Sequence, residues 1–199
     1  MLVNLQYVHK ESIDELVQTF KLEIANELSD LENFQDIYKQ TFDIDTYKEL
    51  DDSMVKDFIV EYDIEIINKW FAVKIYDRTS ENQIDKISQA KFKHTAAKMK
   101  TIPQLVRGYF HIVGPYGEIV EHVDTEYGFK TEEIPVYNHI IGISVEDNSI
   151  GIRLINNEVF PFVREQRLSF DAKHPHSAYN RGAGYAVILV LHIERSAFV

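Results

Sequence analysis

The feature that most constrains this chain is a series of short β-like runs, separated by turn signals, between residues 104 and 195. The turn signals are clusters of Gly, Pro, Asn and Asp. Short strands at this regular spacing are typical of a sandwich or a jelly-roll barrel. The predicted strands are Val106–Val113, Glu118–Thr125, Pro135–Val145, Ser149–Ile155, Val159–Arg164, Arg167–Ala172, His176–Asn180 and Tyr185–Glu194. The last run is apolar on both faces, which predicts a central strand covered by helices.

The first hundred residues have a different, helical period. Ser12 and Glu15 have the spacing of a capping box, and an apolar stripe at three- and four-residue steps follows them. Further helices are predicted over Asp52–Phe71, with strand as an alternative for Phe58–Ile66, and over Glu81–Met99. We therefore expect one domain over residues 1–199. It has a mainly helical support region over 1–100 and a strand core over 104–195.

Composition excludes several classes of function. The 199 residues carry a formal charge of −11, which disfavours a general surface for nucleic acid or anionic membranes, because both partners are polyanions. The chain has no cysteine, so it has no disulfide, zinc–thiolate site or thiol nucleophile. Neither a signal peptide nor an apolar run of membrane-spanning length is evident, so we expect a cytoplasmic protein. The sequence does not predict an oligomeric state.

Three residues in the strand region form a candidate metal site. His122 and Asp124 are two apart on one predicted strand, so their side chains point to the same face. His176 opens a later strand, and a jelly roll brings these two strands together. Two imidazoles and one carboxylate leave coordination positions open, as in the facial triad of non-haem Fe(II) oxygenases. The alternative is a hydrogen-bonded or surface His–Asp pair, and His174 competes with His176 as the distal ligand.

The residues around this site resemble a known family. The pattern Pro-x-Gly-x-Ile-x-x-His-x-Asp matches 115–124, and Phe-Asp-x4-His-x3-Asn matches 170–180. The stretches 151–154 and 156–158 look like that family's Leu-Arg-Val-Gly-x-Glu strand and turn. Together they resemble the aspartyl/asparaginyl β-hydroxylase and cis-prolyl hydroxylase branch of the 2-oxoglutarate/Fe(II) oxygenases. The resemblance covers roughly Pro115–Ile193.

This resemblance implies a double-stranded β-helix, mainly β with α, buttressed by N-terminal helices. It also implies Fe(II) held by His122, Asp124 and His176, with 2-oxoglutarate and O2 as cosubstrates for hydroxylation. The substrate would be a free amino acid, a protein or peptide side chain, or another small metabolite. His139 stands where the family often has a histidine near the cosubstrate. His111, four residues before Pro115, would face the same pocket as Tyr109 and Arg107. For both histidines a hydrogen-bonded core position is the alternative.

The sequence departs from the family where the far carboxylate of 2-oxoglutarate usually meets an arginine. Ala186 stands at that place, and Tyr137 stands where a second arginine is usual. A bidentate guanidinium fits a carboxylate, and alanine cannot bind an anion. The remaining candidates for this contact are Arg181, Arg153 and, more weakly, Arg107. Without such a contact, the alternatives are a cupin-type dioxygenase that does not use 2-oxoglutarate, a non-catalytic barrel, or a metal-free β-sandwich.

Overall fold

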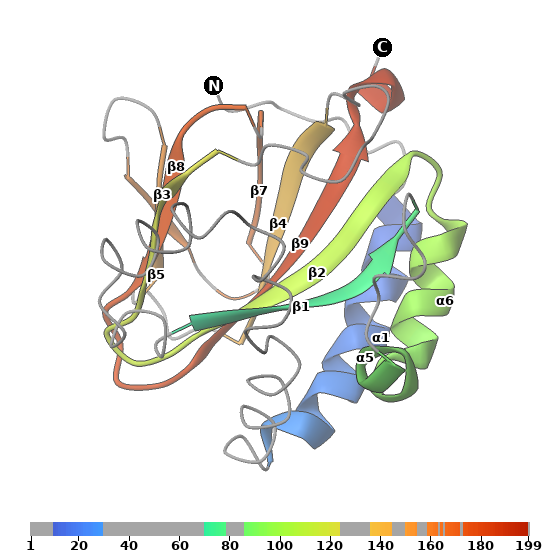
Figure 1. Cartoon of the computed structure of the whole chain (residues 1–199), viewed down its shortest axis with the longest axis horizontal. Coiled ribbons are helices and arrows are strands. Elements are labelled where there is room, and N and C mark those ends of the chain that lie inside the picture. Colours follow the sequence, from blue (N-terminus) through green and yellow to red (C-terminus); the bar gives the residue numbers. More distant parts are fainter. Residues whose placement is uncertain are drawn as a thin grey trace, which may run out of the picture.

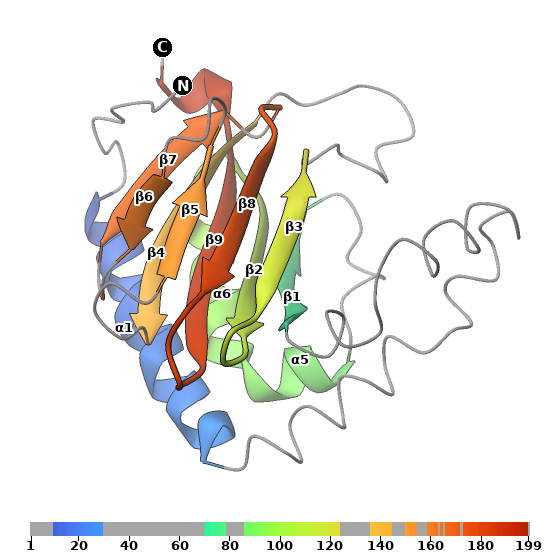
Figure 2. The same ribbon diagram turned by 90° about the vertical axis from the view of Figure 1, so that its left-hand side faces the viewer.

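Two antiparallel sheets face each other in the computed structural model of the chain (Figures 1 and 2). The structure describes residues 10–29, 70–78, 86–123, 136–144, 150–154, 159–162, 164, 166–171 and 173–198. The larger sheet has the strand order β1-β2-β9-β4-β7, and the smaller one has the order β3-β8-β5-β6. The strands are β1 (Trp70–Asp77), β2 (Leu105–Val113), β3 (Glu118–His122), β4 (Val136–Ser144), β5 (Ile150–Arg153), β6 (Val159–Phe162), β7 (Arg167–Asp171), β8 (His176–Asn180) and β9 (Ala186–Glu194).

The chain crosses between the two sheets as it proceeds from β2 to β9. Strands β2, β4, β7 and β9 lie in the larger sheet, whereas β3, β5, β6 and β8 lie in the smaller one. This winding is that of a double-stranded β-helix, so the predicted fold class is confirmed. Each of the eight predicted strands is present, with ends that agree to within a few residues. As predicted, β9 lies inside its sheet, between β2 and β4, and its residues from Ala186 to Ile193 are buried.

Helices cover the outer face of the larger sheet (Figure 1). They are α1 (Lys10–Leu28), α5 (Lys86–Lys91) and α6 (Lys93–Thr101). The apolar stripe of α1 is buried as predicted, although Ser12 lies inside the helix and not at its N-cap. Phe20 and Phe92 pack on Phe110 of β2, each with a ring-centroid distance of 5.1 Å. All three rings are fully buried, so they form the centre of the core on this side of the sheet.

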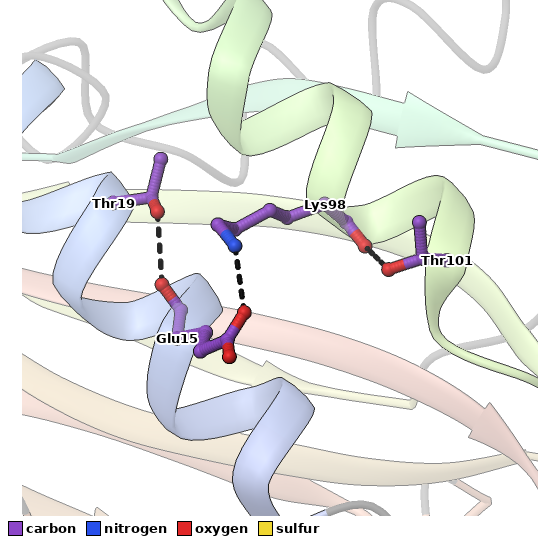
Figure 3. A network of polar contacts seen from close by, with 4 residues as sticks. All are labelled: Glu15, Thr19, Lys98 and Thr101. Atoms are coloured by element: carbon purple, nitrogen blue, oxygen red, sulfur yellow. Dashed lines mark hydrogen bonds and ion pairs between the residues drawn. The ribbon is translucent and has the colours of Figure 1, made fainter.

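Polar contacts join the two longer helices at the surface (Figure 3). The Lys98 ammonium lies 2.8 Å from a Glu15 carboxylate oxygen, and Thr19 and Thr101 donate hydrogen bonds to the carbonyls of Glu15 and Lys98. The hydrogen bond and charge of Lys98 lower the pKa of Glu15. None of the helices in the described part of the chain is long and apolar enough to span a membrane.

The helical interpretation of the first hundred residues needs two corrections. Trp70 and Phe71, which end the second candidate helix, belong to strand β1, and that strand pairs with β2 at the edge of the larger sheet. The rest of that candidate, including Phe58–Ile66, lies outside the described residues. The third candidate consists of two helices, α5 and α6, separated at Phe92. Strand β1 was missed because its apolar residues pack on both faces and therefore show no clean alternation.

Candidate functional site

A cavity lies between the two sheets and is lined by residues of both, among them His122 of β3 and His176 of β8. Its volume of about 40 Å³ has room for an ion and one or two waters. Apolar side chains from both sheets line it, namely Ile119, Ile140, Ile152, Ile188 and Val190. Polar residues also line the cavity, namely Tyr109, His111, His122, Asn138, His176 and Ser177. A mostly dry wall with a few polar groups is the usual form of a small-molecule site.

His122 and His176 are brought together by the pairing of β3 with β8. They are cross-strand partners, and their ring centroids are 4.3 Å apart. His176 is 7% exposed, and its Nδ1 lies 2.9 Å from the carbonyl oxygen of His174. A carbonyl oxygen only accepts hydrogen bonds, so Nδ1 carries the proton and the lone pair of the ring is on Nε2. This arrangement is the usual one for a metal-binding histidine.

These two imidazoles fit a divalent metal of the Fe(II) type. Imidazole nitrogen is a common ligand of Fe, and a pair on adjacent strands leaves the other positions open. The third predicted ligand, Asp124, lies outside the described residues. Accordingly, within the described ranges no group of three His, Asp or Glu side chains is arranged to hold a metal ion. His174 does not line the cavity; it lies in the turn before β8, where its amide donates to the Asp171 carbonyl.

His111 lies where the sequence placed it, on the cavity face of β2. Its ring contacts Trp70 and Tyr109, each with a centroid distance of 5.2 Å. Tyr109 lines the same cavity, and its hydroxyl lies 2.8 Å from Nε2 of His192. Arg107 points to the same face of β2 but does not line the cavity, since it contacts Asp77. The structure therefore brings His111, but not Arg107, directly to the space beside His122 and His176.

His139 lies on the opposite face of β4. Its neighbours Asn138 and Ile140 line the cavity, so alternation along the strand directs His139 toward the helical side. Its Nδ1 lies 2.7 Å from the Ser169 hydroxyl, and the residue is 1% exposed. Burial, with a smaller effect of the Arg167 charge, lowers the pKa of His139 to about 4. His139 thus occupies the hydrogen-bonded core position that the sequence left open as the alternative.

Arg153 and Arg181 lie on the outer side of the smaller sheet. Gly151 and Arg153 alternate with Ile152, which lines the cavity. Arg153 and Arg181 lie over the ring of Tyr179, at 6.0 Å and 4.5 Å from its centroid. Arg181 also follows the far end of β8, about 16 Å along the strand from His176. The structure therefore does not bring either arginine to the cavity.

The comparison with family models shows which protein family this chain belongs to. The model described as aspartyl/asparaginyl β-hydroxylase matches residues 21–196 of this chain. This chain belongs to the aspartyl/asparaginyl β-hydroxylase family. The match includes the strand core, where the sequence motifs lie, and most of the helical region, where we found no motif. A search of curated proteins found no match.

Solved structures that are similar to this chain include a 2OG-Fe(II) oxygenase-family oxidoreductase from Burkholderia pseudomallei. It has 13% identity, covers 72% of this chain and 77% of its own, and has a TM-score of 0.43. A cupin domain of an XRE-family transcriptional regulator from Enterobacter cloacae has 14% identity, covers 63% of this chain and 96% of its own, and has a TM-score of 0.40.

This member of the family has an apolar wall where an arginine was expected. Ala186 is 1% exposed and packs in the barrel core with Val113 and Ile188. Tyr137 shares the outward face of β4 with His139, and Arg195 lies over its ring at 5.2 Å. Neither position supplies a cation to the cavity. Any carboxylate that binds inside this barrel therefore meets other side chains.

Three polar residues of the cavity region were not predicted from the sequence. Asn138 of β4 and Ser177 of β8 line the cavity, and His192 of β9 contacts Tyr109. The sequence carried a signal for His192, which is a polar residue at the end of an otherwise apolar strand. For Asn138 the signal was its neighbour Ile140, because the two residues share a face. Alternation along β4 therefore places Asn138, and not His139, on the same face as Ile140.

Proposed function

We propose that this protein is a non-haem Fe(II)- and 2-oxoglutarate-dependent hydroxylase whose metal ligands are His122, Asp124 and His176. The pairing of His122 with His176 in the lining of the cavity carries this proposal. Membership of the hydroxylase family supports it. Asp124 follows two residues after His122, and we propose it as the carboxylate that completes the set of ligands.

The chemistry divides between the metal and the chain. When bound, Fe(II) with 2-oxoglutarate supplies the O2 activation that replaces a C–H bond by C–OH. The histidines hold the ion, and the His174 carbonyl orients the ring of His176 through its Nδ1–H. The apolar side chains of Ile119, Ile152 and Ile188 line the cavity and disfavour bulk water there. No side-chain general base is required.

For the substrate, we propose an amino acid, a protein or peptide side chain, or a related small metabolite. The cavity is narrow and mostly apolar, so only the reacting end of a larger substrate would enter it. Tyr109, His111 and Asn138 are the polar side chains that could orient that end. All three lie on strands of the larger sheet, which fixes them relative to the histidine pair.

An anaerobic titration tests the proposal. Fe(II) is added to the apoprotein, followed by 2-oxoglutarate, and the visible charge-transfer band of a chelated keto acid is recorded. We expect the wild type to show the band and His176→Ala to lose it together with tight Fe(II) binding. The matched control is His174→Ala, which removes the neighbouring imidazole and keeps the backbone carbonyl; we expect it to bind normally. Loss of binding in the control with retention in His176→Ala would overturn the assignment of the ligand.

A second candidate function is a metal-dependent dioxygenase on the same barrel that does not use 2-oxoglutarate. The apolar surroundings of Ala186 favour it, because the usual cation for the far carboxylate is missing. The same titration separates the two functions. Fe(II) binding with no spectral response to 2-oxoglutarate would favour the second candidate, and succinate release with turnover would exclude it.

A further inference from the structure

Two turns lie side by side at the end of the barrel that is away from the histidine pair (Figures 1 and 2). The turn over residues 114–117 connects β2 to β3, and the turn over residues 181–185 connects β8 to β9. Strand β3 ends at His122 and β8 begins at His176, so both turns lie at the other ends of these strands. This end of the barrel is therefore remote from the proposed metal site.

Asn180 joins the two turns to each other. Its side-chain Nδ2 lies 2.7–3.1 Å from the carbonyl oxygens of Val113, Gly114 and Gly184, and its Oδ1 accepts a hydrogen bond from the Gly182 amide. Asn180 itself is 1% exposed. The two turns are thus held as one rigid surface, which lowers the entropy cost of binding a partner there.

Each turn presents a tyrosine to solvent. Tyr116 is 67% exposed and Tyr185 is 41% exposed. The φ angle of Tyr116 is 57°, in the left-handed region that glycine or asparagine adopts at less cost than tyrosine. Strained backbone of this kind persists mainly at functional positions, and tyrosine is enriched among the residues that dominate protein interfaces. An exposed ring at a strained position indicates a contact with another molecule.

Two arginines lie beside these turns on the outer face of the smaller sheet. The ring of Tyr179 covers Gly151 so closely that a Cβ built there would lie 2.2 Å from the tyrosine oxygen. Arg181 and Arg153 lie over this ring, at 4.5 Å and 6.0 Å from its centroid. Within the described ranges neither guanidinium forms an ion pair. Stacking on a ring holds a guanidinium in place and leaves its N–H edges to donate to a carboxylate.

The charge of this face favours an acidic partner. Glu118 is the cross-strand partner of Tyr179, so one carboxylate shares the face with Arg153 and Arg181. Val159, which pairs with Arg153, adds an apolar side chain that is 44% exposed. A local excess of arginine governs contacts within a screening length of about 8–10 Å, even in a chain whose charge is −11.

Other occupants fit this face less well. A nucleic acid is a polyanion along its whole length, so the remainder of a chain with a charge of −11 repels it. A second copy of the chain would bring the same excess of arginine to a twofold contact. A short segment with carboxylates for the arginines and apolar side chains for the tyrosines matches both features of the face.

We propose that Tyr116, Tyr185, Arg153 and Arg181 form a docking surface for an acidic peptide segment of another protein. This docking surface is separate from the metal site, and its role does not depend on the proposed function. The segment binds as a partner and not as a substrate, because Arg181 lies about 16 Å along β8 from His176.

A peptide selection tests the docking surface. A phage-displayed library of random peptides is selected on the immobilised full chain. The most enriched peptide is then labelled with fluorescein, and its affinity is measured by anisotropy beside a counterpart in which amides replace all its carboxylates. We expect the enriched peptides to combine Asp or Glu with aromatic residues. The amide counterpart should bind more weakly, and the affinity of the acidic peptide should fall as salt is added.

Four variants locate the binding. Arg181→Glu should weaken binding of the acidic peptide at least about tenfold. Tyr116→Asn should also weaken it, whereas the melting temperature should stay the same or rise, because asparagine adopts the left-handed backbone more readily. Lys93→Glu, the matched control, makes the same change of charge at an exposed position of α6 and should bind normally. His176→Ala, in the metal site, should also bind the peptide as the wild type does.

Three results would overturn the docking surface. The first is a selection that yields no peptides rich in carboxylates, or yields peptides that bind Arg181→Glu as well as the wild type. The second is a fall in the melting temperature of Tyr116→Asn, which would show that the ring supports the turn. The third is binding of a single-stranded oligonucleotide, or self-association in sedimentation, that Arg181→Glu abolishes; either would assign the surface to that other occupant.

Discussion

The two faces of the larger sheet have the same backbone but different chemistry. The helix-facing side is apolar, with Phe110, Leu189 and Leu191 packed against α1 and α6. The cavity side changes from apolar near Ala186 to polar at His192 and its cross-strand partner Asn138. Each strand contributes alternate residues to the two faces, so a shift of one residue moves a side chain from the core to the site. The helical face is thus a packed apolar core, whereas the cavity face combines apolar packing with the polar side chains of the proposed site.

The largest expected effect tests the helix-facing side. Phe110→Ala removes a fully buried ring that contacts Phe20 and Phe92, so the free energy of unfolding should fall by about 3–5 kcal/mol. Chemical denaturation measures this loss. Fe(II) affinity per folded molecule should stay unchanged, because the ring points away from the cavity. In contrast, Phe170→Ala should weaken Fe(II) binding as well, since Phe170 contacts His176. Equal metal affinity in both variants would contradict the division between the faces.

The next effect depends on pH. The pKa of His139 is about 4 in the folded protein and near the ordinary histidine value of 6.5 in the unfolded chain, so the unfolded chain binds more protons between these pH values. Stability contributed by neutral His139 is therefore present above pH 6.5 and is lost as the pH falls toward 4. Between pH 7 and 5 the loss amounts to about 2 kcal/mol. His139→Gln should remove this part of the pH dependence in denaturation curves, and an unchanged dependence would refute the burial of His139 on the helical side.

A smaller effect is expected where α6 approaches β2. A Cβ built on Gly108 would lie 2.4 Å from the sulfur of Met99, which is itself fully buried. Gly108→Ala should therefore cost about 1–2 kcal/mol through overpacking. In a Met99→Ala background the same substitution should cost less, because the space is then open. A double-mutant cycle by denaturation measures this coupling, and strict additivity would argue against the close approach.

The smallest effect concerns the surface of the helical layer. Lys98→Met removes the ion pair with Glu15 shown in Figure 3, and exposed pairs contribute little. Lys98 lowers the pKa of Glu15, so the pair stabilises the fold above the ordinary pKa of a glutamate and loses this effect as the pH falls through the lowered value. NMR titration of Glu15 should show its pKa rising in the variant. A large loss of stability would mean that the helices depend on this contact rather than on their apolar faces.

Much of the fold could be predicted from the sequence. The ends of the strands coincide with turn residues, such as Gly114 to Gly117, where the Gly117 amide bonds to the Gly114 carbonyl. The pairing of His122 with His176 followed from placing two histidines on the second and seventh strands of a jelly roll. Local signals sufficed for the ends of the strands, because turns and alternation are local properties of the chain, whereas the pairing of the two histidines followed from the topology of the jelly roll.

The rest depended on information that a single sequence does not carry. The face to which His139 points is set by which residues of β4 pack on the helices, and a shift of one residue reverses it. Arg153 and Arg181 were chosen for their charge, whereas their positions over Tyr179 are determined by the pairing of β5 with β8. The ion pair of Asp77 with Arg107 joins β1 to β2, and β1 was not predicted as a strand. Asp124 remains a prediction.

The central claim is tested most directly by locating the metal. A crystal grown anaerobically with Fe(II) and measured at the iron absorption edge would show the ion as an anomalous peak. We predict one peak within about 2.2 Å of a ring nitrogen of both His122 and His176, with Nε2 as the coordinating atom of His176. A peak bound elsewhere, or the two imidazoles turned away from a common point in the presence of Fe(II), would contradict the account.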